Sequence, residues 1–259
     1  MDILFFIVCG CCAGIIAGLL GLGGGIIVVP ALNWYLQSKT GYADHAMHLA
    51  IATALAIMVP TALMSSYAHY RHGSLNSPML QSIIPWLIIG AIIGVLSALK
   101  AQSSHLMIVF GVLATLLVYK TFRRKPISTQ RWTPPLPPVM GFIGFWSVIT
   151  GTGGGTLTVP YLILRGELAR VAVGTSAACG FVIGIVSVCG FLVTSAPIGL
   201  AQTIGYVYWP AFFGIGISAM LCAPLGAKLS HQIQVRRLEL ILAAVLSVVA
   251  IKMFVDAFS

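Results

Sequence analysis

Charged residues are scarce in this sequence, and their scarcity excludes most classes of water-soluble protein. Only 7% of the 259 residues are charged, whereas 59% are hydrophobic, and soluble domains usually carry about a quarter charged residues. Whole stretches lack Asp, Glu, Lys and Arg altogether, namely 3–38, 45–70, 72–99, 101–119, 132–164 and 171–227. Because about 20 apolar residues suffice for a helix to cross the hydrocarbon layer, the composition predicts an all-α polytopic membrane protein.

Acidic residues are the rarest charges, and their positions argue against proton coupling. The five are Asp2, Asp44, Glu167, Glu239 and Asp256, and each falls at the end of a predicted span. A proton relay through a bilayer needs such a group near the bilayer centre. An anion leaving a cell needs no relay, because each unit charge gains about 2.3 kcal/mol per 100 mV on exit.

Motifs for metals, nucleotides and catalysis are also missing. No His-Glu-x-x-His occurs, and the glycine runs lack the third glycine of a dinucleotide fingerprint and the lysine of a phosphate loop. We therefore expect no cofactor, no metal and no catalytic residue. The cysteines lie in apolar stretches without zinc or redox spacing and are interpreted as small buried hydrophobes, with a sulfur-handling role open for Cys179: Cys9, Cys11, Cys12, Cys179, Cys189 and Cys222.

Basic residues outnumber acidic ones, which gives a formal net charge of +9. Such an excess in a soluble protein would suggest nucleic-acid binding, but here the Lys and Arg residues lie in short segments between spans, where they act as topology signals. A basic, proline-rich stretch at 122–137 can neither cross lipid nor continue a helix. We predict that it is a cytoplasmic linker, and we expect a lipid bilayer and a small anion, not nucleic acid, as partners.

The chain reads as a duplication. Residues 21–30 and 151–160 share a run of three glycines followed by proline, and 49–54 match 171–176. These matches divide the chain into two membrane repeats, 1–121 and 138–259. Each repeat offers one glycine-broken segment and three ordinary spans, with the broken segments at 3–37 and 137–164 and the spans at 47–68, 80–99, 105–121, 169–194, 203–227 and 236–257.

The positive-inside rule decides whether the broken segments cross the membrane. If the broken segments cross, seven basic residues lie on each side of the membrane, which gives no bias. If each folds back as a re-entrant hairpin, Lys39, Lys100 and Lys252 lie on one side and the other 11 basic residues on the opposite side. The skew favours re-entrant hairpins. One hairpin and three spans make an odd number of crossings, so the repeats are predicted to be inverted, with both termini outside the cytoplasmic membrane.

The glycine breaks are the candidate substrate site. Backbone that leaves a helix at membrane depth must be buried by protein or line a cavity, and in an inverted repeat the two hairpin tips meet near the midplane. The half-helices that begin near Gly25 and Gly155 present unpaired N–H groups and positive dipole ends, which suit an anion. The predicted substrate-binding residues are Gly23, Gly24, Gly25, Thr53, Thr152, Gly153, Gly154, Gly155, Thr156, Thr175 and Ser176.

Structural roles compete with this interpretation. Small residues in membrane helices also allow close packing, which is how we interpret Gly94 and Gly226, whereas packing alone would not require three consecutive glycines followed by proline in both repeats. A helical threonine can bond a carbonyl one turn back, so a structural role stays open for Thr53 and Thr175. An anion channel and a non-transporting scaffold remain alternative functions, and the oligomeric state is open.

Several of these motifs resemble those of one family. The doubled Gly-Gly-Gly-x4-Pro, the Ala50-x-Ala52-Thr53 and Gly174-Thr175-Ser176 stretches, and Ala68-His69-x-Arg71-x-Gly73 are similar to the TauE/SafE family, sulfite exporter type. The resemblance covers nearly the whole chain. It implies an inner-membrane permease that exports sulfite, sulfoacetate or related sulfur-containing anions, with other organic acids for some members. The family usually shows a serine after the threonine. Ser176 keeps this serine after Thr175, whereas Ala54 stands in its place after Thr53. If the serine hydroxyl binds substrate, the resemblance implies that the two half-sites are unequal.

Overall fold

The fold is a bundle of helices in which two helical segments are interrupted by glycines. The computed structural model describes residues 2–20, 24–39, 41–122, 135–194, 202–229 and 235–258. The first half of the chain contains α1 (Asp2–Leu20), α2 (Gly25–Gln37), the short 3-10 helix η1 (Ala43–His45), α3 (Ala46–Arg71), α4 (Ser77–Lys100) and α5 (Ser103–Phe122). The second contains α6 (Leu136–Thr150), α7 (Gly155–Leu164), α8 (Ala169–Val193), β1 (Thr203–Ile204), β2 (Val207–Tyr208), α9 (Trp209–Leu229) and α10 (Val235–Phe258).

These helices coincide with the predicted segments. Among the described residues, four helical stretches are long and apolar enough to cross a membrane, namely Ala43–Arg71, Ser77–Lys100, Ser103–Phe122 and Ala169–Val193. The glycine breaks separate α1 from α2 and α6 from α7, as expected. The chain is therefore a multi-pass, all-α membrane protein. Residues 21–23 and most of the predicted linker, 123–134, lie outside the described residues.

One predicted boundary was wrong. The span expected to begin at residue 203 begins at Trp209, because the six preceding residues form an antiparallel hairpin. Thr203 pairs with Tyr208 and Ile204 with Val207, and Gly205 takes a positive φ of 56° in the turn. β-branched and aromatic residues favour strands, and they are also apolar enough to extend a hydropathy-based span.

The first glycine-broken segment doubles back on itself. Lys39, just after α2, forms an ion pair of 3.0 Å with Asp2 at the start of α1. The rings of Phe5 and Tyr35 stack with their centroids 5.3 Å apart. The start of α1 and the end of α2 therefore lie side by side, and the glycine break is at the far end of the pair.

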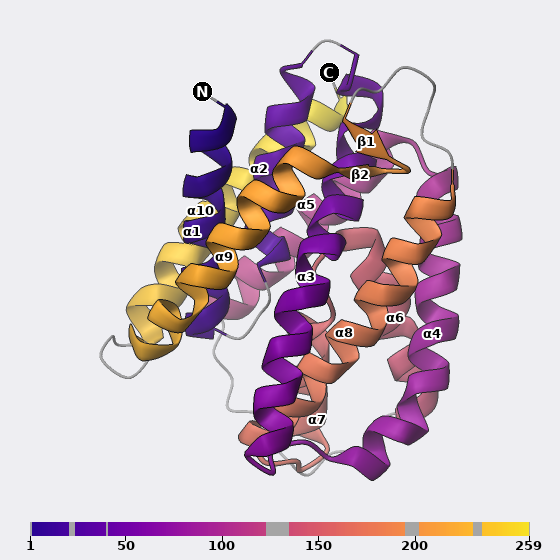
Figure 1. Cartoon of the computed structure of the whole chain (residues 1–259), viewed down its shortest axis with the longest axis vertical. Coiled ribbons are helices and arrows are strands. Elements are labelled where there is room, and N and C mark those ends of the chain that lie inside the picture. Colours follow the sequence, from indigo (N-terminus) through magenta and orange to yellow (C-terminus); the bar gives the residue numbers. More distant parts are fainter. Residues whose placement is uncertain are drawn as a thin grey trace.

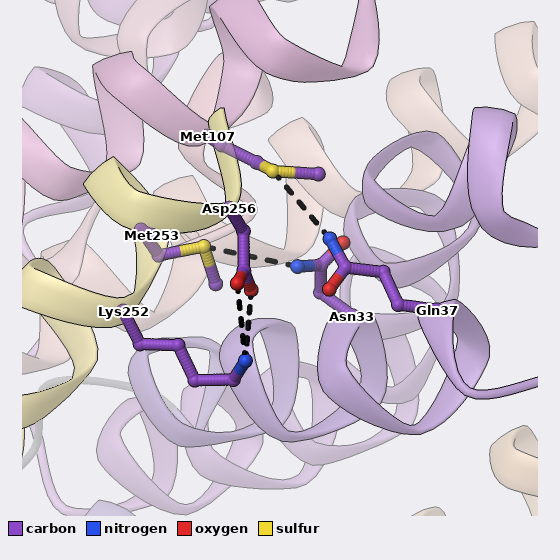
Figure 2. A network of polar contacts seen from close by, with 6 residues as sticks. All are labelled: Asn33, Gln37, Met107, Lys252, Met253 and Asp256. Carbon is purple, nitrogen blue, oxygen red and sulfur yellow. Dashed lines mark hydrogen bonds and ion pairs between the residues drawn. The ribbon is translucent and has the colours of Figure 1, made fainter. Parts of the chain in front are cut away.

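Amide groups of α2 point to sulfur atoms on neighbouring helices. Figure 2 shows Asn33 directed at Met253 of α10 and Gln37 directed at Met107 of α5, beside the ion pair of Lys252 and Asp256. The amide-to-sulfur distances are 3.8 Å and 3.6 Å. A thioether is a weak acceptor, but these contacts place two polar groups of α2 against protein rather than lipid.

The helices of the two halves of the chain pack mainly against each other. Helix α1 packs on α9, α6 on α4, α3 on α8, and α5 on α10. Glycines bring the helices close, since a Cβ on Gly14 would lie 2.8 Å from the Cα of Ala219, and one on Gly144 would lie 2.7 Å from the carbonyl oxygen of Leu87. Close approach at small residues is the usual basis of helix association in membranes. Gly94 follows the packing prediction, because a Cβ there would lie 2.9 Å from the carbonyl oxygen of Phe145.

The bundle has two ends that differ in the elements they contain. Figure 1 shows the start of α1, the end of α10 and the β1–β2 hairpin at the same end of the molecule, which we call the hairpin end. At the opposite end, which we call the turn end, α3 ends and α4 begins.

Candidate functional site

The two glycine breaks meet inside the bundle. Gly25, the first residue of α2, lies against the backbone of Gly151 and Thr152, where a Cβ would collide with the Gly151 carbonyl oxygen and lie 3.1 Å from the Cα of Thr152. Gly151, Gly153 and Gly154 have φ values of 63°, 73° and 80°, a region that other residues rarely adopt. Glycine is thus required here both for backbone conformation and for contact between the two halves of the chain.

A cavity of about 210 Å³ adjoins this contact. Its volume holds several water molecules or one small ligand. Its walls come from both glycine breaks and from four long helices. The lining residues are Ala13, Gly14, Ala17, Gly24, Gly25, Val28, Ala54, Ile57, Met58, Thr61, Ala62, Ser65, Gly153, Gly155, Val173, Ser176, Ala177, Gly180, Ala219 and Ala223.

The lining offers hydrogen-bond donors but no charged side chain. In α2 the first backbone bond joins the N–H of Ile27 to the carbonyl of Gly24 at 3.0 Å, and in α7 the N–H of Leu157 donates to Gly154 at 3.1 Å. The N–H groups before these, including those of Gly25 and Gly155, lie at the helix N-termini, where the backbone dipoles favour negative charge. Among the described residues, the Ser176 hydroxyl has no hydrogen-bond partner. The arrangement can therefore hold a small anion without a counter-charge.

The predicted site residues fall into two groups. Gly24, Gly25, Gly153, Gly155 and Ser176 line the cavity. Gly23 lies outside the described residues. The other five are absent from the lining: Thr53, Thr152, Gly154, Thr156 and Thr175.

Three of the threonines outside the lining make specific hydrogen bonds. The hydroxyls of Thr152 and Thr150 lie 2.8 Å apart. The Thr53 hydroxyl oxygen accepts from the backbone N–H of Tyr208 at 2.9 Å, and that of Thr175 accepts from the N–H of Asn76 at 3.3 Å.

The remaining two residues flank the cavity wall. Thr156 is buried in the first turn of α7. Gly154 faces Ile183 and Ser147, and a Cβ there would lie 3.2 Å from the Ser147 hydroxyl oxygen.

Sequence reasoning missed most of the apolar lining. Ala54 carried a signal, because the repeat aligns it with Ser176, and both line the cavity. Met58 carried none, since an apolar residue inside a span looks like any other. Its sulfur packs directly on Gly153 and lies 4.0 Å from where a Cβ of Gly180 would stand. A flexible thioether therefore forms part of the wall beside the second glycine break.

The cavity extends from the glycine contact toward the turn end. Every residue of α3 from Ala46 to Ile57 is buried, whereas from Met58 to Arg71 only Ala62 is buried. The lining residues of α1 come from its second half, away from the hairpin end, those of α8 come from its first half, and those of α3 lie around its middle. Toward the hairpin end, the buried residues Tyr206, Val207 and Tyr208 cover the bundle.

A second cavity, of about 230 Å³, lies between α2 and α10. Its walls are mostly apolar, and it includes the ion pair of Lys252 and Asp256 shown in Figure 2. The buried side-chain oxygen of Asn33 has no partner within the described part of the chain. A paired lysine and one amide oxygen are a poorer anion site than the donors at the glycine breaks.

The chain is similar to known membrane proteins over nearly its full length. The family model described as "Sulfite exporter TauE/SafE" matches residues 6–253. A "Probable membrane transporter protein" of Haemophilus influenzae is 32% identical over 259 residues, which cover 97% of this chain and 98% of that protein. A "Probable membrane transporter protein YunE" of Bacillus subtilis is 24% identical over 99% of this chain and 98% of its own length.

An archaeal relative shows that the similarity is broad. A probable membrane transporter protein of Methanocaldococcus jannaschii is 27% identical over 95% of this chain and 93% of its own length. No solved structure matches the chain significantly. The matched model and the full-length relatives agree with the resemblance noted in the motifs, and the chain belongs to the sulfite exporter TauE/SafE family of membrane transporters.

Proposed function

We propose that this protein exports a small anion, sulfite or a related organosulfonate, through a midplane site where its two glycine breaks meet. The observation that carries the proposal is the cavity that joins Gly25 and Gly155, at the N-termini of two half-helices, to the free hydroxyl of Ser176. Broken helices in secondary transporters direct such N-termini at anionic substrate groups. The polar groups that would bind substrate are therefore contributed by both repeats.

The packing of the helices supports an inverted repeat. If α1–α5 correspond to α6–α10, a two-fold axis in the membrane plane exchanges the α1–α9 contact with the α6–α4 contact. The same axis passes between α3 and α8 and between α5 and α10, which pack on each other. A rocking motion of the repeats about this axis would expose the cavity to the two sides alternately.

Charge supports an orientation with the turn end in the cytoplasm. By their places in the sequence, Lys39, Lys100 and Lys252 belong to the hairpin end and the other 11 basic residues to the turn end. At the hairpin end, Lys39 and Lys252 are each paired with a carboxylate. The positive-inside rule assigns the basic end to the cytoplasm, so both termini would lie outside an inner membrane, and the cavity would extend toward the cytoplasmic side.

The cavity and the family support the choice of substrate class. The cavity is uncharged and mostly apolar, with N–H and hydroxyl donors on part of its wall, and its size suits a compact oxyanion better than a large organic acid; the matched family is described as a sulfite exporter. With the cell interior negative, exit of each unit of negative charge is favoured by about 2.3 kcal/mol per 100 mV. No ion coupling is required for export.

An anion channel with the same site is the second candidate. Buried aromatic residues of the β1–β2 hairpin cover the bundle at the hairpin end, so the cavity reaches toward one end only, which favours a carrier. A channel would give unitary currents, whereas a carrier would give saturable flux with countertransport of labelled substrate. A non-transporting scaffold would give neither.

Flux in proteoliposomes tests the proposal. Purified protein would be assayed with a panel of sulfite, organosulfonates and small carboxylates, with protein-free liposomes as the control. We expect saturable, voltage-driven flux of one or more sulfur oxyanions and countertransport of the same anion. Failure to move any member of the panel by protein that is folded in the liposomes would contradict the proposal.

A further inference from the structure

Two threonines each hold the start of a helix in the other repeat. The backbone N–H of Tyr208, the residue before α9, donates to the hydroxyl oxygen of Thr53 in α3 at 2.9 Å. The backbone N–H of Asn76, the residue before α4, donates to the hydroxyl oxygen of Thr175 in α8 at 3.3 Å. Both threonine side chains are fully buried, so each hydroxyl binds backbone of the opposite repeat and does not face the cavity.

The two bonds occupy matching positions in the duplicated sequence. Thr53 and Thr175 align through the stretches 49–54 and 171–176. Asn76 and Tyr208 stand at equivalent places, because each directly precedes a helix with proline as its second residue, Ser77-Pro78 in α4 and Trp209-Pro210 in α9. One contact has therefore been kept in both copies of the repeat, and in each copy it joins the two repeats.

The bonds lie at opposite ends of the molecule. Tyr208 belongs to β2, so the Thr53 bond lies at the hairpin end. Asn76 precedes α4, so the Thr175 bond lies at the turn end. Gly174 supports the second bond, because its missing side chain lets the Ser74 carbonyl oxygen lie directly on α8.

Each bond is one residue away from the cavity wall. Ala54 follows Thr53 and Ser176 follows Thr175, and both Ala54 and Ser176 line the cavity. A ligand that shifts α3 or α8 at the wall therefore moves the adjacent threonine relative to its partner N–H.

We infer that these bonds are paired gate latches, with Thr53–Tyr208 closing the outer mouth of the cavity and Thr175–Asn76 closing the inner mouth. The inference rests on the proposed carrier function and adds to it the residues that set the balance between outward-facing and inward-facing states. Because the latches oppose each other, removing one shifts the balance toward opening at its own end. The threonines act as positioning residues and do not touch the substrate.

Sided labelling of a cavity cysteine tests the latches. In a chain whose six native cysteines are replaced, Thr61→Cys places one thiol in the wall, and a membrane-impermeant thiol reagent is added to either side of oriented vesicles. Thr53→Val is expected to raise the rate of labelling from outside by about three- to tenfold, the effect of losing one hydrogen bond. Thr175→Val is expected to raise labelling from inside by a similar factor and not from outside.

Matched variants separate gating from simple destabilisation. Thr53→Ser and Thr175→Ser keep the hydroxyl and are expected to label like the parent chain, while the double valine variant is expected to return the ratio of outside to inside labelling toward the parent value. If each single valine variant changes the labelling rate equally from both sides, or from neither side, the latch proposal is contradicted. Flux of the parent chain, measured in the same preparation, tests the proposed function separately. If the parent chain transports the anion but the valine variants do not change the side of labelling, only the latch proposal is contradicted. If the parent chain shows no flux, the carrier function itself is contradicted.

Discussion

At the residue scale, one hydroxyl distinguishes the two halves of the site. Ser176 and Ala54 line the cavity at positions that match in the two halves of the sequence, so at this pair of positions only the second half contributes a hydroxyl, beside those of Thr61 and Ser65 elsewhere in the lining. A hydrogen bond to a charged group contributes about 1.5–3 kcal/mol. The family resemblance implied unequal half-sites, and at this pair of positions they differ by one hydroxyl. Removing or adding that hydroxyl should change transport kinetics measurably.

Ser176→Ala is expected to raise the KM for the transported anion by about tenfold or more, because the substrate loses one charge-assisted hydrogen bond. Transport kinetics in proteoliposomes measure the change. The control is Ser187→Ala on the same helix, since the buried Ser187 hydroxyl donates to the carbonyl of Ile183 at 2.7 Å and lies outside the cavity lining. Equal KM values for both variants would show that the Ser176 hydroxyl does not bind the substrate.

Ala54→Ser is expected to lower the KM, because it adds a donor at the matching position of the first repeat. Combined with Ser176→Ala, it should recover part of the lost affinity. The same kinetic assay applies, and no change in KM in either background would show that substrate does not approach α3 at this position.

Gly24→Val is expected to abolish flux while leaving the protein folded in the membrane. A Cβ at Gly24 would lie 3.5 Å from that of Ala13, an ordinary contact, so the added methyl groups would project into the cavity that Gly24 lines. Gly141→Val is the matched control, because a Cβ there also has its nearest neighbour at 3.5 Å, the Trp86 carbonyl oxygen, and Gly141 lies outside the cavity lining. Normal flux in Gly24→Val would count against the site.

At the element scale, the glycine-broken helices were predictable and the hairpin before α9 was not. Runs of three glycines cannot sustain a helix, since each costs about 1 kcal/mol relative to alanine, and this cost is visible in the sequence alone. Residues 203–208 are apolar, so hydropathy merges them with the span that follows. Their pairing depends on the turn at Gly205, and hydropathy alone does not detect a turn.

The binding partners of the threonines were equally hidden from the sequence. Thr53 and Thr175 lie in the matched stretches 49–54 and 171–176, and their hydroxyls were predicted to contact the substrate. Each instead accepts a backbone N–H from a residue far along the chain, 155 positions away for Thr53 and 99 for Thr175. Only the three-dimensional arrangement of the repeats reveals which N–H lies opposite each hydroxyl. The internal match in the sequence identifies the two threonines as equivalent positions. It does not identify Tyr208 and Asn76 as their hydrogen-bond partners.

Cysteine labelling tests the direction of each broken segment. In a chain without its native cysteines, Asp44→Cys lies after the α1–α2 hairpin and Leu168→Cys after the second broken segment, α6–α7, and both residues are exposed. For inverted re-entrant hairpins, an impermeant reagent is expected to label the first only from outside and the second only from the cytoplasm. Labelling of both from the same side would contradict the inverted repeat.

At the scale of the whole molecule, the energy for export would come from charge rather than from protons. The cavity lining contains no titratable side chain, and the ion pairs Lys39–Asp2 and Lys252–Asp256 are exposed or partly exposed. In the proposed function, fixed dipoles and hydroxyls would bind the anion, and the membrane potential would set the direction of net movement.

Flux is therefore expected to follow voltage and to be unaffected by a pH gradient once the concentration of the transported ionic form is held constant. Proteoliposomes with a potassium diffusion potential, positive or negative, and with or without a pH difference, separate the two driving forces. A pH gradient that drives uphill anion movement at zero voltage would show proton coupling and overturn this account of energetics.

The most direct test of the central claim, that the meeting glycine breaks bind the substrate anion, is a crystal structure with selenite as a heavy analogue of sulfite. We expect an anomalous selenium peak in the cavity between the N–H groups of Gly25 and Gly155 and the Ser176 hydroxyl, and its loss in Gly24→Val. A peak elsewhere in the protein, with the cavity empty, would contradict the claim if selenite is transported under the same conditions.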